Sequence, residues 1–206
     1  MLSVEKALEV IISNISAKIK SEKIDIFNCF GRTLFNDLQA EFDVPFRNNS
    51  AMDGYAVLSS DINDADPTSP VSLEVVDEIQ AGYEFQDKKL ISGKAIRIMT
   101  GAPIPNGADS VVPFEDTAES ENSVKVFREE LKNENIRFAG EDIIQGTVVL
   151  KRGTRLDSAE IGIISSLNLN KVNVYQKPKV AIISTGDEIS EPGNNYSGNI
   201  INSNAY

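Results

Sequence analysis

A polar turn runs directly into an apolar segment at Asn48-Asn49-Ser50-Ala51-Met52-Asp53-Gly54-Tyr55-Ala56. Asn, Ser, Asp and Gly in a row favour a turn held by hydrogen bonds from side chains to the backbone. Because Gly54 has no side chain, the carboxylate of Asp53 is presented without steric cover. The apolar residues that follow predict a strand at 55–58. Turn chemistry alone favours a simple capped turn over a functional carboxylate.

Outward from this turn the chain is β-rich. Val44-Pro45 marks a break on the N-terminal side. From there to about residue 140, short β-prone runs alternate with Gly, Pro, Asn and Asp turns. We expect a polar loop at 59–70, a hairpin tip at 117–123, and strands at 71–76, 95–99, 110–113 and 124–127.

The flanking regions predict helices as well as strands. Ser3 can cap an amphipathic helix over 3–20. Asp157 precedes Glu160 by three positions, which favours a capping box and a helix over 158–167. We further expect a short helix at 29–38 and strands at 24–27, 147–150 and 171–175.

The C-terminal part opens with a compact apolar run, Val180-Ala181-Ile182-Ile183, followed by Ser184-Thr185-Gly186-Asp187-Glu188. This pattern predicts a fully buried strand that runs into a glycine turn, as at the start of a parallel α/β domain. Ligands bind such sheets at the carboxyl ends of the strands. Because one strand cannot make a sheet, we expect the chain to be part of a longer protein.

Composition limits the chemistry. The 206 residues include 20 basic and 31 acidic side chains, which gives a net charge of −11 and argues against nucleic acid or anionic lipid as partners. There is no histidine, and Cys29 is the single cysteine, so a zinc cage and an internal disulfide are excluded. We expect Cys29 to be an inert buried thiol rather than a nucleophile. Neither a secretory leader nor a membrane span is recognisable, so we expect a cytoplasmic protein.

Two further motifs carry polar groups on turns. Arg97-Ile98-Met99-Thr100-Gly101-Ala102-Pro103 ends a strand at a Thr-Gly turn, where backbone amides and the Thr100 hydroxyl can hold an oxyanion. A rigid loop without a ligand is an equally good interpretation. In Gly140-Glu141-Asp142-Ile143, two adjacent carboxylates can bind Mg²⁺ through water. A solvated acidic turn is the more common outcome for such a pair.

Taken together and in this order, the motifs resemble the MoeA family of molybdopterin molybdenumtransferases and the homologous E-domain of gephyrin. The similarity rests on residues 50–56, 97–103, 140–143 and 184–188, and on Gly107-Ala108-Asp109 with Val111, Val112 and Glu115. It implies a mixed α+β fold. A discontinuous first domain (1–44 and 141–177) would hold an inserted β-rich second domain (45–140). Residues 178–206 would start a truncated α/β molybdopterin-binding, MogA-like domain.

The resemblance also implies an activity. Family members form homodimers and insert molybdenum into adenylylated molybdopterin, with molybdate and Mg²⁺ and release of AMP. The enzyme that adenylylates molybdopterin is a further expected partner. The implied catalytic residues are Asp53, Thr100, Asp142 and Glu188, and Asp142 and Glu188 would also hold the metal. The implied substrate-binding residues are Ser50, Gly101, Ser184, Thr185, Gly186 and Asp187.

The chain departs from the family pattern at Arg47 and Asn48, where most members have a Phe-Asp pair. The lost carboxylate would weaken a contact in the cleft, and the added cation would help to draw in an anion. We expect the 206 residues alone to be inactive in molybdenum insertion. Two alternatives stay open: a dimerisation or scaffold module of the gephyrin type, and a stand-alone Mg²⁺-dependent phosphoanhydride hydrolase.

Overall fold

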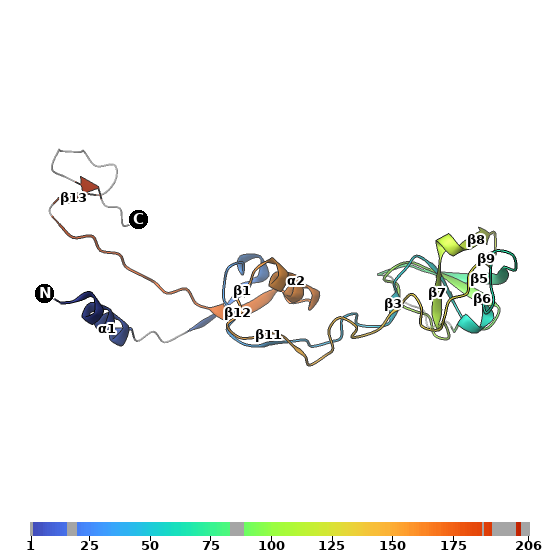
Figure 1. The fold of residues 1–206 in the computed structure, drawn as a ribbon, viewed down its shortest axis with the longest axis horizontal. Coiled ribbons are helices and arrows are strands. Elements are labelled where there is room, and N and C mark those ends of the chain that lie inside the picture. Colours follow the sequence, from blue (N-terminus) through green and yellow to red (C-terminus); the bar gives the residue numbers. More distant parts are fainter. Residues whose placement is uncertain (1, 16–19, 83–88, 187, 191–200, 203–206) are drawn as a thin grey trace. The chain divides into compact units, whose positions relative to one another are not determined.

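The structure is a computed structural model that describes residues 2–15, 20–82, 89–186, 188–190 and 201–202. Its described part is mostly β, with two α-helices (Figure 1). Contacts divide the chain into two units. One comprises Met1–Glu22 with Tyr175–Tyr206, and the other comprises Lys23–Val174. The expected domain boundaries at 44, 140 and 177 remain predictions.

A six-stranded sheet lies in the Lys23–Val174 unit. Its strand order is β7-β4-β6-β5-β9-β8, and β5 pairs with β6 in parallel while the other pairs are antiparallel. The strands are β4 (Gly54–Val57), β5 (Val71–Ile79), β6 (Lys94–Ile98), β7 (Ser110–Pro113), β8 (Thr117–Ser120) and β9 (Ser123–Val126). All five runs expected in this region are strands, and the expected hairpin tip is largely β8. Short 3₁₀ turns follow three elements: η1 (Ile26–Asn28), η2 (Ser59–Asp61) and η3 (Phe114–Asp116).

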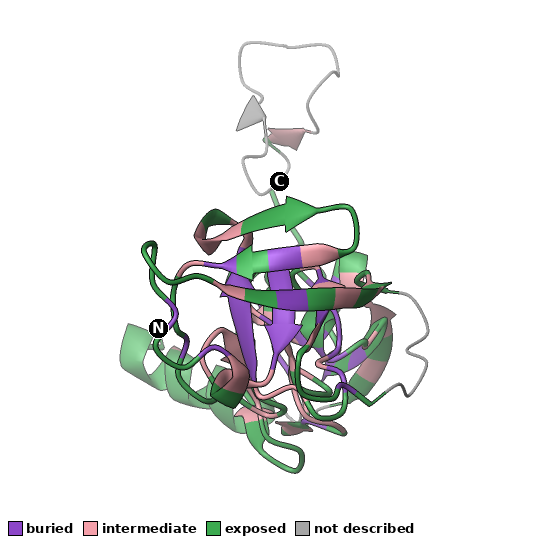
Figure 2. Cartoon of the chain, turned by 90° about the vertical axis from the view of Figure 1, so that its right-hand side faces the viewer, coloured by how far each residue is buried: buried purple, intermediate pink, exposed green. Residues whose placement is uncertain are grey.

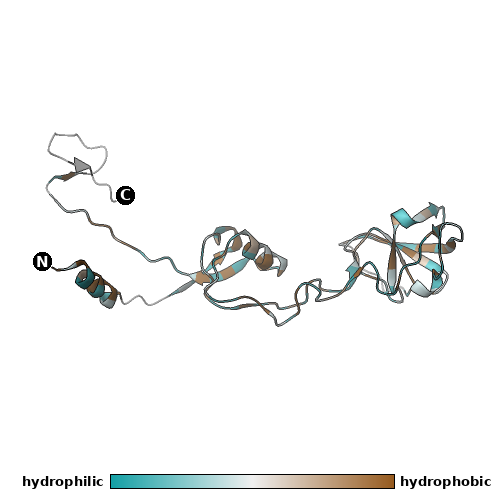
Figure 3. Cartoon of the chain, viewed as in Figure 1, coloured by the Kyte–Doolittle hydropathy of each residue, from teal (hydrophilic) through white to brown (hydrophobic). Residues whose placement is uncertain are grey.

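Strands β4 and β7 of this sheet are buried along their whole length, so they are packed on both faces. Alternation along β4 sends Tyr55 and Val57 into one cluster with Val112 and Val124. Ala56 points the other way, into a cluster with Ile96, Ile98 and Val111. Figure 2 shows the buried residues of these strands in purple, and Figure 3 colours the hydrophobic residues of the ribbon brown.

Short strand pairs join distant parts of the same unit. β2 (Leu38–Gln39) pairs with β11 (Val148–Leu150), and β3 (Asn49–Ser50) pairs with β10 (Ile136–Arg137). β12 (Lys171–Tyr175) pairs with β1 (Ser21–Asp25), at the limit of the unit. A second core collects Cys29, Leu34, Leu156, Ile164 and Val174 around helix α2 (Ser158–Ser166).

The cap signals in the sequence are confirmed. Ser3 Oγ accepts a hydrogen bond of 3.3 Å from the Lys6 amide at the start of α1 (Val4–Asn14). Asp157 and Glu160 form the capping box of α2, with the Asp157 amide donating to Glu160 Oε2 at 3.0 Å. Cys29 is buried, its thiol donates to the Ile26 carbonyl, and burial raises its pKa, as expected of an inert thiol. Among the described residues, no helix has the length and apolar character needed to cross a membrane.

The first helix ends earlier than the expected residue 20, because Ile15 caps it in an extended conformation. Two other expected elements are wrong. The helix expected at 29–38 does not form: after η1, Gly31 takes a φ of +71°, and the chain extends into bridges from Thr33 to Arg155 and from Leu34 to Val174. The strand expected at 180–183 is also absent, and Val180, Ile182 and Ile183 are 69–80% exposed. An apolar run needs neighbouring strands to satisfy its backbone. The described part of that unit offers only a short parallel pair, β13 (Ile189–Ser190) with β14 (Ile201–Asn202).

Candidate functional site

Strand β3 brings three motifs together that lie far apart in the sequence. On one side, Ser50 pairs with Ile136 and Asn49 with Arg137. On the other side, the Ser50 amide donates to the Ala102 carbonyl at 2.9 Å, and the Gly101 amide donates to the Ser50 carbonyl at 2.8 Å. One short strand, β3, therefore connects three parts of the chain: the turn at 50–53, the turn at 100–102 and the segment before Asp142.

The carboxylate of Asp53 is fixed by Thr100. Its Oδ1 accepts from the Thr100 amide at 2.6 Å and from Thr100 Oγ1 at 2.7 Å. These two bonds, the backbone bond first, hold the pKa of Asp53 below its usual value, and the positive charge of Arg97 adds to the effect. Asp53 and Thr100 are both exposed, so an ionised carboxylate in a fixed orientation faces the surface.

Gly54 is required for this placement. A Cβ atom built on Gly54 would lie 2.0 Å from the carbonyl oxygen of Val112, on the neighbouring strand β7. No side chain fits there, so the glycine lets β4 and β7 approach closely. The same strand pair is extended by the Phe114 amide, which donates to the Asp53 carbonyl at 3.1 Å. Gly54 therefore allows the turn that contains Asp53 to lie directly against β7.

The turn amides that could hold an oxyanion are already bonded within the chain. The Thr100 amide and hydroxyl donate to Asp53, the Gly101 amide donates to Ser50, and the Ala102 amide donates to the Met99 carbonyl at 2.9 Å. Ser50 is buried, and its hydroxyl donates to the Met52 carbonyl at 2.5 Å. Of the two interpretations of this turn, the bonding favours the rigid loop, because these donors already bond to groups within the chain. What the turn presents outward is the carboxylate of Asp53.

Asp142 is paired with a residue that the sequence motifs did not single out. Arg137 Nη2 donates to both carboxylate oxygens of Asp142, at 2.7 and 2.6 Å, and Arg137 Nε lies 3.5 Å from Glu141 Oε1. This bonding raises the pKa of Arg137. The sequence signal was only a basic residue five positions before an acid. Asn48 supports the same segment, because its Oδ1 accepts from the Ala139 amide at 2.9 Å.

The remaining predicted residues belong to the other unit. Ser184, Thr185, Gly186 and Glu188 are exposed, and the Gly186 carbonyl accepts from the Ile189 amide at 3.0 Å. Asp187 lies outside the described residues. The structure thus brings Asp53, Thr100, Ser50 and Gly101 into direct contact. Asp142 is linked to this group less directly: it pairs with Arg137, which lies on β10, and β10 pairs with β3.

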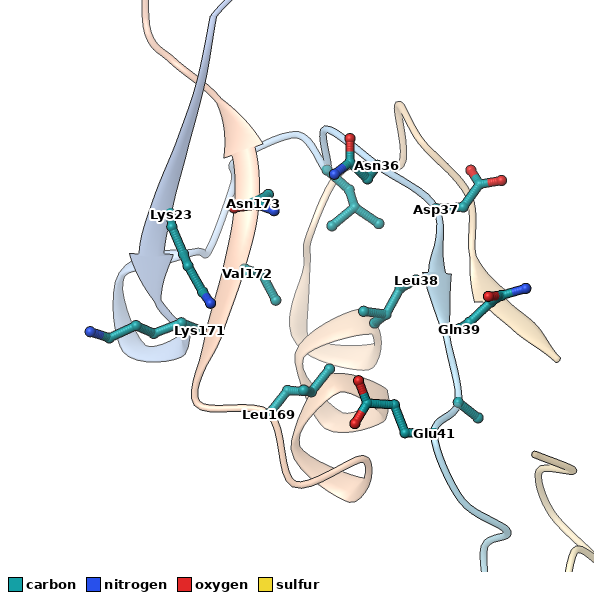
Figure 4. Close-up of a pocket in the computed structure, with 12 residues that line it drawn as sticks. Lys23, Asn36, Asp37, Leu38, Gln39, Glu41, Leu169, Lys171, Val172 and Asn173 are labelled. Atoms are coloured by element: carbon teal, nitrogen blue, oxygen red, sulfur yellow. The ribbon is translucent and has the colours of Figure 1, made fainter. Parts of the chain in front are cut away.

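A separate cavity of about 350 Å³ lies elsewhere in the Lys23–Val174 unit (Figure 4). Lys23 and Lys171 line it on β1 and β12, and Asp37 and Glu41 line it on the segment around β2. Its apolar lining comes from the second core. It contains none of the residues that the sequence motifs selected, so the motifs and this cavity point to different places.

Comparison with known proteins identifies the chain's relatives. The family model described as MoeA N-terminal region (domain I and II) matches residues 2–168. A molybdopterin molybdenumtransferase of Staphylococcus epidermidis is 38% identical over 190 residues, which cover 92% of this chain and 45% of that protein. One of Nostoc sp. is 39% identical over 201 residues, or 95% and 46% of the two chains.

Solved structures agree with these sequence relatives. The crystal structure of the molybdopterin biosynthesis MoeA protein from Pyrococcus horikoshii OT3 is similar with a TM-score of 0.81 at 35% identity. That similarity covers 94% of this chain and 51% of the archaeal one. The chain therefore spans about half the length of the relatives it matches.

Proposed function

The chain belongs to the MoeA N-terminal family, and from this membership we propose that it contributes the Asp53 face of the site that inserts molybdenum into adenylylated molybdopterin. In this reaction molybdate is the substrate, the metal joins the dithiolene sulfurs, and the adenylate leaves as AMP. The proposal places the chain in the cytoplasm as a homodimer, with the enzyme that adenylylates molybdopterin as a further partner.

The observation that carries the proposal is the Asp53–Thr100 contact. Two turns that lie far apart in the sequence, both part of the family resemblance, meet in one pair of hydrogen bonds of 2.6 and 2.7 Å. The result is an ionised carboxylate whose direction is set by a threonine rather than by a flexible rotamer. Such a group can accept a hydrogen bond or order a water molecule beside the phosphoanhydride. Arg47 is exposed close by in the sequence and supplies positive charge for the anions.

Magnesium remains part of the proposal, but the described residues do not present a ready site for it. Both oxygens of Asp142 are engaged by Arg137, and no three acidic, His or Cys side chains in the described part of the chain gather as metal ligands. Mg²⁺ at phosphate sites takes one or two carboxylates together with phosphate oxygens and water. Asp142 and Glu188 are the proposed carboxylates. The chain's own residues bind and orient the substrate in this proposal.

A chimera tests the proposal. Residues 1–206 of this chain replace the matching region of the Staphylococcus epidermidis relative, and the product is expressed in a bacterium that lacks its own molybdenumtransferase. We expect molybdoenzyme activity to return, and Asp53→Asn to lower it by about a hundredfold, as for loss of an oriented catalytic group. The matched control is Asp66→Asn, because Asp66 makes the same two bonds to Thr68, at 2.6 and 2.7 Å, in an unrelated turn.

Two results would contradict the proposal. Equal activity of the Asp53→Asn and Asp66→Asn chimeras would remove Asp53 from the reaction and favour the scaffold interpretation. Turnover of ordinary nucleotides by the unmodified chain, without any pterin, would favour the phosphoanhydride hydrolase.

A further inference from the structure

The cavity of about 350 Å³ opens where two neighbouring segments of the chain separate (Figure 4). At its upper end the segments are joined, because the Phe35 amide donates to the Asn173 carbonyl on β12 at 2.9 Å. Beyond Phe35 the chain turns away to pair with β11, where Leu38 lies opposite Leu150. Residues 36–41 therefore leave β12, and the cavity lies between the two segments.

The edge of β12 that faces the cavity presents backbone groups. Successive residues of a strand point their backbone groups to opposite edges. The Asn170 carbonyl accepts from the Ile26 amide at 3.0 Å, on the side of β1, whereas the Asn173 carbonyl accepts on the other side. Lys171 lies two positions before Asn173, so its N–H and C=O face the cavity side. No backbone hydrogen bond joins Lys171 to residues 36–41, and both segments belong to the described part of the chain. Such an edge can pair with a further strand.

The inner side of the cavity is apolar. Four aliphatic side chains of the second core line it: Leu34, Leu38, Leu169 and Val172. Leu38 and Leu169 are only half-buried, and they lie between β12 and the segment around β2 (Figure 4). The cavity is at the small end of the range of about 300–1,000 Å³ that is usual for ligand pockets. It therefore suits a short stretch of extended chain, whose alternate side chains point to one face.

Charged side chains of opposite sign flank the cavity. Lys23 and Lys171 line it on the side of β1 and β12, and both are exposed. Asp37 and Glu41 line the opposite side and are exposed as well. Asp37 Oδ1 accepts from the Arg152 amide at 2.7 Å. The ion pairs among the described residues do not involve Lys23, Lys171 or Glu41. An occupant with one acidic and one basic residue would complement both sides.

We propose that this cavity receives an extended peptide segment of a partner protein, in which apolar residues alternate with one acidic and one basic residue. The backbone of the segment pairs with the N–H and C=O of Lys171. Its apolar side chains contact Leu38 and Leu169, and its charged side chains lie on the exposed face, between the lysines and Glu41. Backbone pairing supplies affinity in this mode of recognition, and the pockets for alternate side chains supply specificity. The site shares no residue with the Asp53 turn, so the proposal does not depend on molybdenum insertion.

NMR titration of the 206-residue chain with the capped peptide acetyl-Val-Glu-Val-Lys-Val-amide tests the proposal. We expect saturable shifts of the Lys171 and Glu41 amides, with a dissociation constant of about 1 mM or tighter. The Lys171 amide should also become about fivefold better protected from hydrogen exchange, because it gains a partner. A peptide with Ser in place of each Val should bind about tenfold more weakly, because its apolar contacts are lost. A peptide with Pro at the centre should give no protection, because proline cannot continue the backbone pairing.

Variants at exposed lysines keep the test independent of folding. Lys171→Glu should weaken binding about threefold, as for the reversal of a cross-strand charge pair. Lys151→Glu should leave binding unchanged, because Lys151 is exposed but does not line the cavity. No saturable shift, equal binding of the Ser peptide, binding without protection of the Lys171 amide, or equal binding by Lys171→Glu would each overturn the proposal. Shifts of the same amides with protein concentration alone would assign the cavity to a second copy of the chain and overturn it too. Each of these failures would leave the proposed function untouched.

Discussion

Asp53 and Asp66 make the same bonds with partners at very different distances along the chain. Asp66 Oδ1 accepts from the amide and the hydroxyl of Thr68, two positions away. Asp53 Oδ1 accepts from the amide and the hydroxyl of Thr100, 47 positions away. Hydrogen bonding lowers the pKa of both carboxyl groups.

A lowered pKa is therefore no mark of function in this molecule. The Asp66 bonds close a local turn, whose remaining donor is the Ser69 amide at 2.8 Å. The Asp53 bonds connect the start of β4 to the turn after β6, and these strands are antiparallel neighbours in the sheet. What distinguishes Asp53 is the number of separate segments that must be in place before its carboxylate takes up its direction.

Gly54→Ala should have the largest effect on the Asp53 turn, because it changes the strand contact on which this turn, unlike the Asp66 turn, depends. The added methyl group would collide with the Val112 carbonyl, and β4 or β7 would have to move. We expect a loss of about 3–4 kcal/mol in the free energy of unfolding, at the upper end for overpacking. Urea denaturation measures it. The control is Gly162→Ala in α2, where nothing lies within 4 Å and alanine should stabilise by about 0.5–1 kcal/mol. A Gly54→Ala protein as stable as the unmodified chain would show that β4 and β7 do not approach closely.

A smaller effect is expected from Ser50→Ala. Ser50 is 1% exposed, its hydroxyl donates to the Met52 carbonyl, and it accepts from the Met52 amide at 3.3 Å. Removal of the hydroxyl leaves these groups without a partner and should cost about 1–2 kcal/mol. Ser69→Ala in the local turn should stay within about 0.5 kcal/mol, because Ser69 takes part through its backbone. Equal losses in the free energy of unfolding for Ser50→Ala and Ser69→Ala would mean that the buried Ser50 hydroxyl stabilises its turn no more than the Ser69 side chain does.

The same contrast explains how far the sequence could be interpreted. Local signals were reliable: the capping box of α2 formed, and strands at 110–113 and 171–175 have the predicted bounds. The Asp66 turn lies in the predicted polar loop and depends on residues within three positions. Contacts between distant residues were a different matter. The meeting of Asp53 with Thr100 followed only from the family resemblance, and the pairing of Asp142 with Arg137 was not predicted.

Both wrong secondary-structure predictions have a tertiary cause. In place of the helix expected at 29–38, Gly31 takes a positive φ, and Leu34 joins the second core from an extended segment that bridges to Val174. Val180 to Ile183 have the composition of a buried strand, yet composition does not supply neighbouring strands. The sequence could not decide between an oxyanion site and a rigid loop at 100–102, because it does not reveal that the carbonyl of Ser50 accepts a hydrogen bond from one of the turn amides.

The smallest expected effect is on the pKa of the two aspartates. Their folded pKa values lie below the ordinary 3.8, so the stability they contribute is present above about pH 3.8 and is lost as the pH falls through the folded pKa. Thr100→Val removes the hydroxyl donor of Asp53, and Thr68→Val removes that of Asp66. Each pKa should rise toward 3.8 without reaching it, because the backbone donors remain.

Carboxyl titration by NMR measures both shifts, and Thr100→Ser and Thr68→Ser should leave them unchanged because the hydroxyl is kept. An Asp53 pKa that does not respond to Thr100→Val would mean that the hydroxyl is not its donor. The two turns should respond alike in titration and unlike in the chimera, where only Thr100→Val should lower molybdoenzyme activity. If Thr68→Val also lowered molybdoenzyme activity, the Asp53 site would not differ from an ordinary turn. The expected difference arises because the direction of the Asp53 carboxylate depends on two segments far apart in the sequence, whereas the Asp66 turn depends only on neighbouring residues.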